Sequence, residues 1–129
     1  MPSNNRVVRR YQDLVCWQLA DELKREVYKL LDASPSARRD FDFARQLRRA
    51  ASSGPASLSE AFGYYKHKES AKFVRIAKGS LTETHNHLGD GVDRGHWTAE
   101  RCEPLLQLAD RAIGATTEWL KYLMASEEP

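Results

Sequence analysis

The chain has 129 residues, of which 41% are hydrophobic and 29% charged, and its net charge at pH 7 is +2. This length is typical of one domain, and the composition is that of a globular protein rather than a disordered chain. No apolar run approaches the roughly 20 residues of a membrane-spanning helix, and the N-terminal residues lack the apolar segment of a secretory signal. We therefore expect one cytoplasmic domain with no membrane contact.

Apolar residues that recur with the 3.6-residue period of an α-helix predict four helices. The first covers residues 13–32 and ends before Pro35, because proline lacks a backbone N–H and restricts the residue before it. Steps of three and four residues define its buried stripe: Cys16, Ala20, Leu23, Val27 and Leu30.

The second predicted helix covers residues 41–64, and small residues fill its middle from position 50 to 61. Pro55 lies among them, and an interior proline costs about 3 kcal/mol. We therefore expect this helix to kink or to break into two pieces. The small side chains favour close packing of a neighbouring helix. Glu60, the acidic residue of this run, is expected to be a buried, hydrogen-bonded structural carboxylate.

The third predicted helix covers residues 69–88. Gly89, Gly91 and Gly95 are expected to stop it and to form the following loop. One of its faces is predicted to be buried almost end to end. The stripe on that face consists of Phe73, Ile76, Ala77, Ser80, Leu81, Thr84 and Leu88.

The fourth predicted helix covers residues 98–124, with Thr98 as its N-cap and Pro104 bending or delaying its first turn. Its apolar residues form two adjacent stripes over more than half of its circumference, whereas a bundle helix needs only about a third. The surplus favours contact with another subunit over deep burial in a monomer. The stripes are Leu105, Leu108, Ala112, Ala115, Trp119, Tyr122 and Leu106, Ala109, Ile113, Thr116, Leu120, Leu123.

Helices of similar length with short connections pack as antiparallel neighbours. The predicted fold is therefore all-α, an antiparallel up-down-up-down four-helix bundle in residues 13–124. A flexible basic arm, residues 1–12, precedes the bundle, and a short tail, residues 125–129, follows it.

No complete active site is visible in the sequence. His85 and His87 would point about 200° apart on a helix and cannot converge on one metal ion. None of the four histidines follows an arginine at the spacing of the helical HEPN ribonucleases, and serine-nucleophile elbows and phosphate-binding loops are absent. Cys16 and Cys102 are too few for a disulfide framework or a zinc site, so we expect two buried apolar thiols. The prediction is a non-enzyme without metal or cofactor; an uncharacterised hydrolase remains an alternative.

Basic side chains are the stronger functional signal. Residues 1–92 carry 16 basic and 11 acidic side chains, whereas residues 93–129 carry 4 and 7. Cations on a surface bind phosphates with release of counterions, so two basic helix faces are candidate nucleic-acid sites, although a solvated helix face is the alternative. The candidate residues are Arg45, Arg48 and Arg49 in the second helix and Lys68, Lys72, Arg75 and Lys78 in the third.

Three stretches of the chain, residues 11–17, 46–60 and 73–83, resemble a known family. It is the four-helix bundle family of the protein encoded in the intervening sequence of bacterial 23S ribosomal RNA genes. The resemblance implies an up-down-up-down bundle that assembles as a homopentameric ring. It also implies a relation to the accessory protein of diversity-generating retroelements, a basic pentamer that associates with a reverse transcriptase and nucleic acid. The family carries no established catalytic residues.

Two functional hypotheses follow. The first is a non-enzymatic, oligomeric scaffold that contacts RNA or DNA through the basic faces of the second and third helices. The second is a protein-binding adaptor without a nucleic-acid role, in which the surplus apolar surface of the fourth helix and the pair Tyr64–Tyr65 dock a partner.

Overall fold

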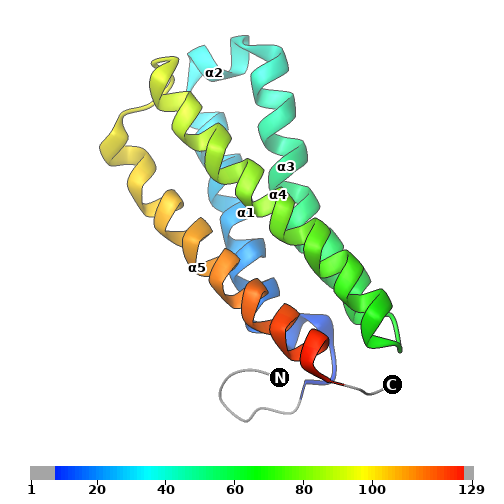
Figure 1. Cartoon of the computed structure of the whole chain (residues 1–129). Coiled ribbons are helices and arrows are strands. Elements are labelled where there is room, and N and C mark those ends of the chain that lie inside the picture. The colour runs from blue at the N-terminus through cyan, green and yellow to red at the C-terminus, as the bar shows by residue number, and fades with distance from the viewer. Residues whose placement is uncertain (1–7, 127–129) are drawn as a thin grey trace.

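The computed structural model describes residues 8–126, and every regular element in that part of the chain is helical. Four long helices lie side by side, with a short helix at one end (Figure 1). The all-α bundle expected from the sequence is thus confirmed. The elements in chain order are a one-turn 3₁₀ helix at Tyr11–Asp13, α1 at Val15–Ala33, α2 at Pro35–Arg39, α3 at Phe41–Phe62, α4 at His67–Asp93 and α5 at Ala99–Ala125.

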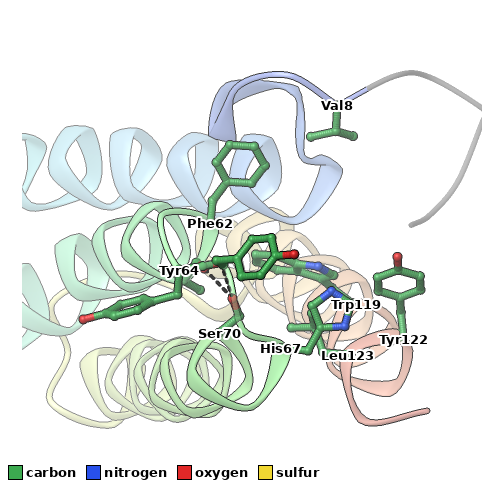
Figure 2. A pocket seen from close by; sticks show the side chains of 10 residues that line it. Val8, Phe62, Tyr64, His67, Ser70, Trp119, Tyr122 and Leu123 are labelled. Atoms are coloured by element: carbon green, nitrogen blue, oxygen red, sulfur yellow. Dashed lines mark hydrogen bonds between the residues drawn. The ribbon is translucent and has the colours of Figure 1, made fainter. Parts of the chain in front are cut away.

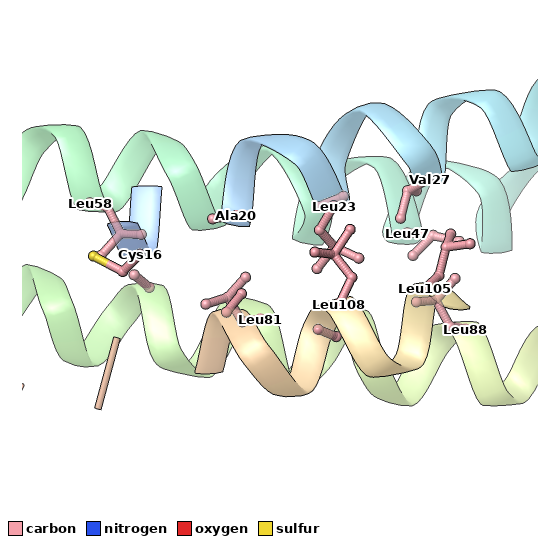
Figure 3. Close-up of a cluster of buried hydrophobic side chains, with 14 of the residues drawn as sticks. Cys16, Ala20, Leu23, Val27, Leu47, Leu58, Leu81, Leu88, Leu105 and Leu108 are labelled. Atoms are coloured by element: carbon pink, nitrogen blue, oxygen red, sulfur yellow. The ribbon is translucent and has the colours of Figure 1, made fainter. Parts of the chain in front are cut away.

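Each long helix packs against two others, because α1 and α4 both contact α3 and α5. The apolar core runs along the bundle between the four helices (Figure 3). Both cysteines are buried free thiols within it, as predicted. Burial raises the pKa of the Cys16 thiol to about 12, so this side chain acts as a small apolar residue. The largest fully buried side chains include Leu14, Leu23, Leu31, Leu47, Leu58, Leu81 and Leu88.

The ends of the predicted bundle lie partly outside the described residues. Of the predicted basic arm, residues 1–7 are not described, whereas Tyr11 and Gln12 belong to the 3₁₀ helix. The Tyr11 ring packs edge-on against Trp17 of α1, with 5.3 Å between ring centroids. Of the predicted tail, residues 127–129 are not described, and Ala125 is the last residue of α5.

Pro55 does not divide the second predicted helix, since α3 is one helix through the proline. Close packing against α4 accounts for this, because tertiary contacts override local propensity. A Cβ atom added to Gly54 would lie 3.1 Å from Cδ2 of Leu81. Beside it, Ser80 donates a hydrogen bond to Ser53, with 2.9 Å between the Oγ atoms. The small residues therefore bring the two helices together, as expected.

Three expectations about which residues are buried are wrong. Glu60 is exposed rather than buried, because the neighbouring Ala61 occupies the inward direction and successive residues differ by about 100° around a helix. On α4, Ile76 is 47% exposed and Phe73 only half-buried, while Val74 is fully buried. The core face of α4 is thus rotated from the predicted stripe.

Side-chain caps fix where two of the helices begin. The chain after α1 forms the short helix α2, because Ser34 Oγ caps it by accepting from the Ala37 N–H. Thr98 caps α5 as predicted, accepting from the Arg101 N–H at 3.0 Å. Pro104 does not delay α5, which begins at Ala99.

The third predicted helix does not stop at its first glycine. α4 continues through Gly89 and Gly91 to Asp93, and the chain turns at Gly95, where φ is +79°. A tertiary contact explains why the helix continues. The Trp97 ring packs directly on Gly91, where a Cβ atom would lie only 2.2 Å from the ring atom Cζ2. Trp97 also donates its indole N–H to the Leu88 carbonyl at 3.0 Å, which ties the turn to α4.

Replacing Gly91 with alanine should therefore destabilise the protein. The added methyl group must displace the buried Trp97 ring, and overpacking of this kind costs about 1–3 kcal/mol. A Gly89→Ala variant is the matched control, because a Cβ there meets nothing within 4 Å and alanine favours the helix by up to about 1 kcal/mol. Urea unfolding midpoints should fall for the first variant and rise or stay for the second; the opposite order contradicts this packing.

Candidate nucleic-acid interface

The three arginines predicted on the second helix lie on the exposed side of α3, and each has an acidic partner. Arg45 pairs with Asp42 at 2.6 Å and Arg48 with Asp32 of α1 at 3.4 Å. Arg49 pairs with Glu83 of α4 at 3.1 Å and also donates to Gln46. Much of the positive potential of this face is therefore neutralised locally.

The cations of α4 differ in this respect. Lys68, Lys72 and Arg75 are exposed, and helical geometry places them within about 60° of one another, opposite the buried face. Lys78 is half-buried on the side of α5. Within residues 8–126, none of these four side chains forms an ion pair with a carboxylate.

Packing on both sides of α4 fixes the direction in which these four cations point. On one edge, the α3 contacts at Gly54 and Ser53 hold α4 in place. On the other, the Arg75 guanidinium lies 3.0 Å from Sδ of Met124 in the last turns of α5. We call Lys68, Lys72, Arg75 and Lys78 the α4 basic row. Its unneutralised charges make it the part of the predicted surface best suited to phosphates.

Histidines do not assemble a metal site in the described part of the chain, where no group of three or more His, Cys, Asp or Glu side chains converges. His85 approaches Asp110 of α5 at 3.4 Å, whereas His87 approaches Glu83 at 3.3 Å. The two rings therefore face different partners, as the helical geometry predicted.

None of the described helices is long and apolar enough to cross a membrane.

A polar cluster that sequence reasoning missed lies at the end of the bundle near α2. His96 Nδ1 is 2.8 Å from Ser36 Oγ, and its Nε2 is 2.9 Å from Oδ2 of Asp40. Arg94 bonds the same carboxylate at 2.9 Å and also reaches Asp90 at 2.8 Å. Only 7% of the His96 side chain is exposed. The contacts of Ser36 and Asp40 with His96 span 60 and 56 residues of sequence, so no local sequence pattern indicates them.

The arrangement of serine, imidazole and carboxylate resembles that of a nucleophile, its base and an orienting acid. Here, however, Arg94 shares the carboxylate, and Ser34 donates its Oγ–H to the His96 carbonyl at 2.9 Å. Arg94 also lies 5.0 Å above the Phe43 ring. The cluster thus ties the α4–α5 turn to α2 and to the start of α3, and we interpret it as a structural clamp.

Asp40 gives this clamp a dependence on pH. Hydrogen bonds from His96 and then from Arg94 lower the pKa of the Asp40 carboxyl below its ordinary value of 3.8. A carboxyl whose pKa is lower in the folded state stabilises the protein above its unfolded-state pKa, and this contribution is lost as pH falls through the folded-state pKa.

An Asp40→Asn variant should therefore be less stable at pH 7, and its stability should change less between pH 5 and pH 2 than that of the wild type, as measured by chemical unfolding across pH. The control is Asp42→Asn, because its exposed pair with Arg45 contributes little. Equal pH profiles for wild type and Asp40→Asn would exclude this role of the carboxylate.

An aromatic pocket lies at the other end of the bundle, beside the α3–α4 turn (Figure 2). Its volume is about 330 Å³. Ser70 fixes the turn by donating to the Ala61 carbonyl at 2.8 Å and approaching the Tyr64 carbonyl at 3.2 Å. The sequence indicated only Tyr64–Tyr65, as part of a protein-docking surface. The lining residues are Val8, Ala61, Phe62, Tyr64, Tyr65, His67, Ser70, Trp119, Tyr122 and Leu123.

Comparison with known proteins identifies the family. The model of the 23S rRNA-intervening sequence protein family matches residues 12–117, which include α1 to α4 and most of α5. The chain belongs to this family. A search of curated proteins finds no match. The resemblance carried by the three sequence stretches is thereby confirmed, and the family is a small helical one rather than a known enzyme family.

Proposed function

We propose that this member of the intervening-sequence protein family is a non-enzymatic scaffold that binds RNA or DNA through the α4 basic row. The observation that carries the proposal is the row itself, whose exposed cations have no carboxylate partner among residues 8–126. Such cations attract phosphates without first losing an intramolecular ion pair. The α3 arginines, Arg45, Arg48 and Arg49, are a secondary contact, because exposed ion pairs of about 0–1 kcal/mol are readily exchanged.

The proposal includes assembly into a homopentameric ring of up-down-up-down bundles. Short connections and the packing of each long helix on the next support this path of the chain. Leu106, Ile113 and Leu120 support association, because they recur every seven residues on α5 and remain only half-buried. A ring would multiply a modest basic row by the number of subunits that reach one strand. The precedent is the pentameric accessory protein of diversity-generating retroelements, to which the sequence resemblance implies a relation.

We place the protein in the cytoplasm, where reducing conditions keep thiols such as those of Cys16 and Cys102 free. The adaptor hypothesis stays the alternative. The observation in its favour is the exposed apolar surface at the end of α5, where Met124 is 59% exposed. Capture of a partner protein that survives nuclease treatment would favour the adaptor.

Binding should weaken with salt and depend on the α4 basic row. Fluorescence anisotropy with a labelled single-stranded RNA, measured from about 50 to 300 mM salt, gives the slope of log K against log salt. For a Lys68→Gln/Lys72→Gln variant this slope should lessen by about 1.4 for each subunit that contacts the strand, since each cation contributes about 0.7.

The matched control is Lys29→Gln/Lys121→Gln, which removes the same charge from α1 and α5. These two lysines pair with Glu26 and Glu118 and lie outside the basic row. Absence of binding by the wild type at about 50 mM salt, or an equal loss in both double variants, contradicts the proposed interface.

Light scattering on the purified protein tests the ring. A homopentamer has about five times the 14.7 kDa of one chain. A Leu106→Glu/Ile113→Glu variant should lower this mass, because charges at half-buried interface positions oppose association. A wild-type protein that elutes with the mass of one chain contradicts the assembly.

A further inference from the structure

We propose that the pocket beside the α3–α4 turn holds one unstacked base of a single-stranded nucleic acid. This inference rests on the proposed function and deepens it, because it assigns the form of nucleic acid and a contact that the basic row does not make. The pocket and the row meet at the start of α4, which begins at His67, one residue before Lys68.

The lining of the pocket suits a flat, apolar ring. Five of its residues carry aromatic rings in addition to the imidazole of His67, and Trp119, Leu123 and Ala61 are buried within it. Its volume of about 330 Å³ is at the lower end for small-molecule sites, which favours one base over a larger ligand.

The aromatic rings at the rim are exposed. Tyr65 is 81% exposed and Tyr122 44% exposed. Tyr64, by contrast, stacks on Phe73 with 5.0 Å between ring centroids and an interplanar angle of 8°, so one face of its ring is already covered. The Tyr122 ring meets the His67 ring at a tilted angle of 49° rather than in a stack. Tyr65 and Tyr122 therefore have ring faces available to stack on a base, and every base offers a π-face for such stacking.

A buried polar atom of one pocket-lining residue lacks a partner. His67 Nδ1 is buried and has no hydrogen-bond partner within residues 8–126. Its ring lies 5.7 Å from the Tyr122 ring, and the two side chains lie close together in Figure 2. A buried polar atom without a hydrogen-bond partner destabilises the state that contains it. This atom is shielded from solvent, so a base reaches it only when the imidazole turns towards the pocket. The polar edge of the base would then supply the missing partner, whereas an aliphatic side chain would not.

Charge around the pocket favours a ligand with a phosphate next to its ring. α4 is 27 residues long, and its N-cap residue Lys66 provides no side-chain cap. The positive end of α4 therefore has no side-chain cap, and Lys66 and Lys68, which flank His67 in sequence, outnumber Glu69 of the same first turn. From there Lys72 and Arg75 continue along α4, so a strand with one base in the pocket would have its next phosphates over the basic row.

The test compares two paired substitutions at the rim. A Tyr65→Leu/Tyr122→Leu variant loses the π-faces, whereas the control Tyr65→Phe/Tyr122→Phe keeps them. Both residues are exposed, so both variants should fold, and circular dichroism checks this. Each variant is titrated by anisotropy with a labelled oligouridine and with a labelled RNA duplex of the same length.

We expect the leucine pair to bind oligouridine about 5- to 150-fold more weakly than the wild type, since stacking contributes about 1–3 kcal/mol per base. The phenylalanine pair should bind oligouridine like the wild type, and both variants should bind the duplex unchanged. Photocrosslinking with 5-iodouridine should place adducts on residues 64–67 or 119–123.

The proposal is overturned if the leucine pair binds oligouridine like the wild type while Lys68→Gln/Lys72→Gln weakens it; the basic row then stands without the pocket. It is also overturned if the leucine pair has a lower mass in light scattering, because the pocket is then a contact between copies of the chain. A wild type that binds neither RNA removes the proposed function itself.

Discussion

The close approach of α3 to α4 is the constraint on which the other features of this protein depend. It exists because residues in the middle of α3 are small: Gly54 leaves room for Leu81, and Ser53 bonds Ser80 at 2.9 Å. This contact keeps α3 continuous through Pro55. It also sets the angle at which α4 presents its cations and, where the two helices are joined, forms the wall of the aromatic pocket.

Local charge pairing separates two basic faces that look alike in the sequence. Each arginine of α3 has a carboxylate within 3.4 Å, whereas the α4 basic row has none among residues 8–126. The number of basic residues therefore overstates the positive potential of the α3 face. It also does not reveal that the α4 cations are unpaired. Exposed cations without internal ion pairs can bind phosphates without first breaking such pairs. The proposed interface therefore lies on α4, towards the end of the bundle where that helix begins.

Helical periodicity was sufficient to predict the four long helices, the two buried cysteines and the close packing of small residues. The errors arose where contacts between distant residues decide the outcome. α4 passes through Gly91 because Trp97 packs on it, and Glu60 is exposed because its neighbours take the core face. The His96 clamp joins Ser36 and Asp40 across some 60 residues, and the aromatic pocket joins the α3–α4 turn to α5. No periodic pattern in one sequence encodes such pairs.

The central claim is that the outer face of α4 is the surface that meets nucleic acid. Chemical acetylation of lysines, quantified by mass spectrometry with and without a single-stranded RNA, tests it residue by residue. Lys68 and Lys72 should lose reactivity when the RNA is bound, because phosphates cover them, while Lys29 and Lys121 on α1 and α5 should not change. Protection that is equal on all four lysines, or confined to Lys29 and Lys121, would contradict the claim.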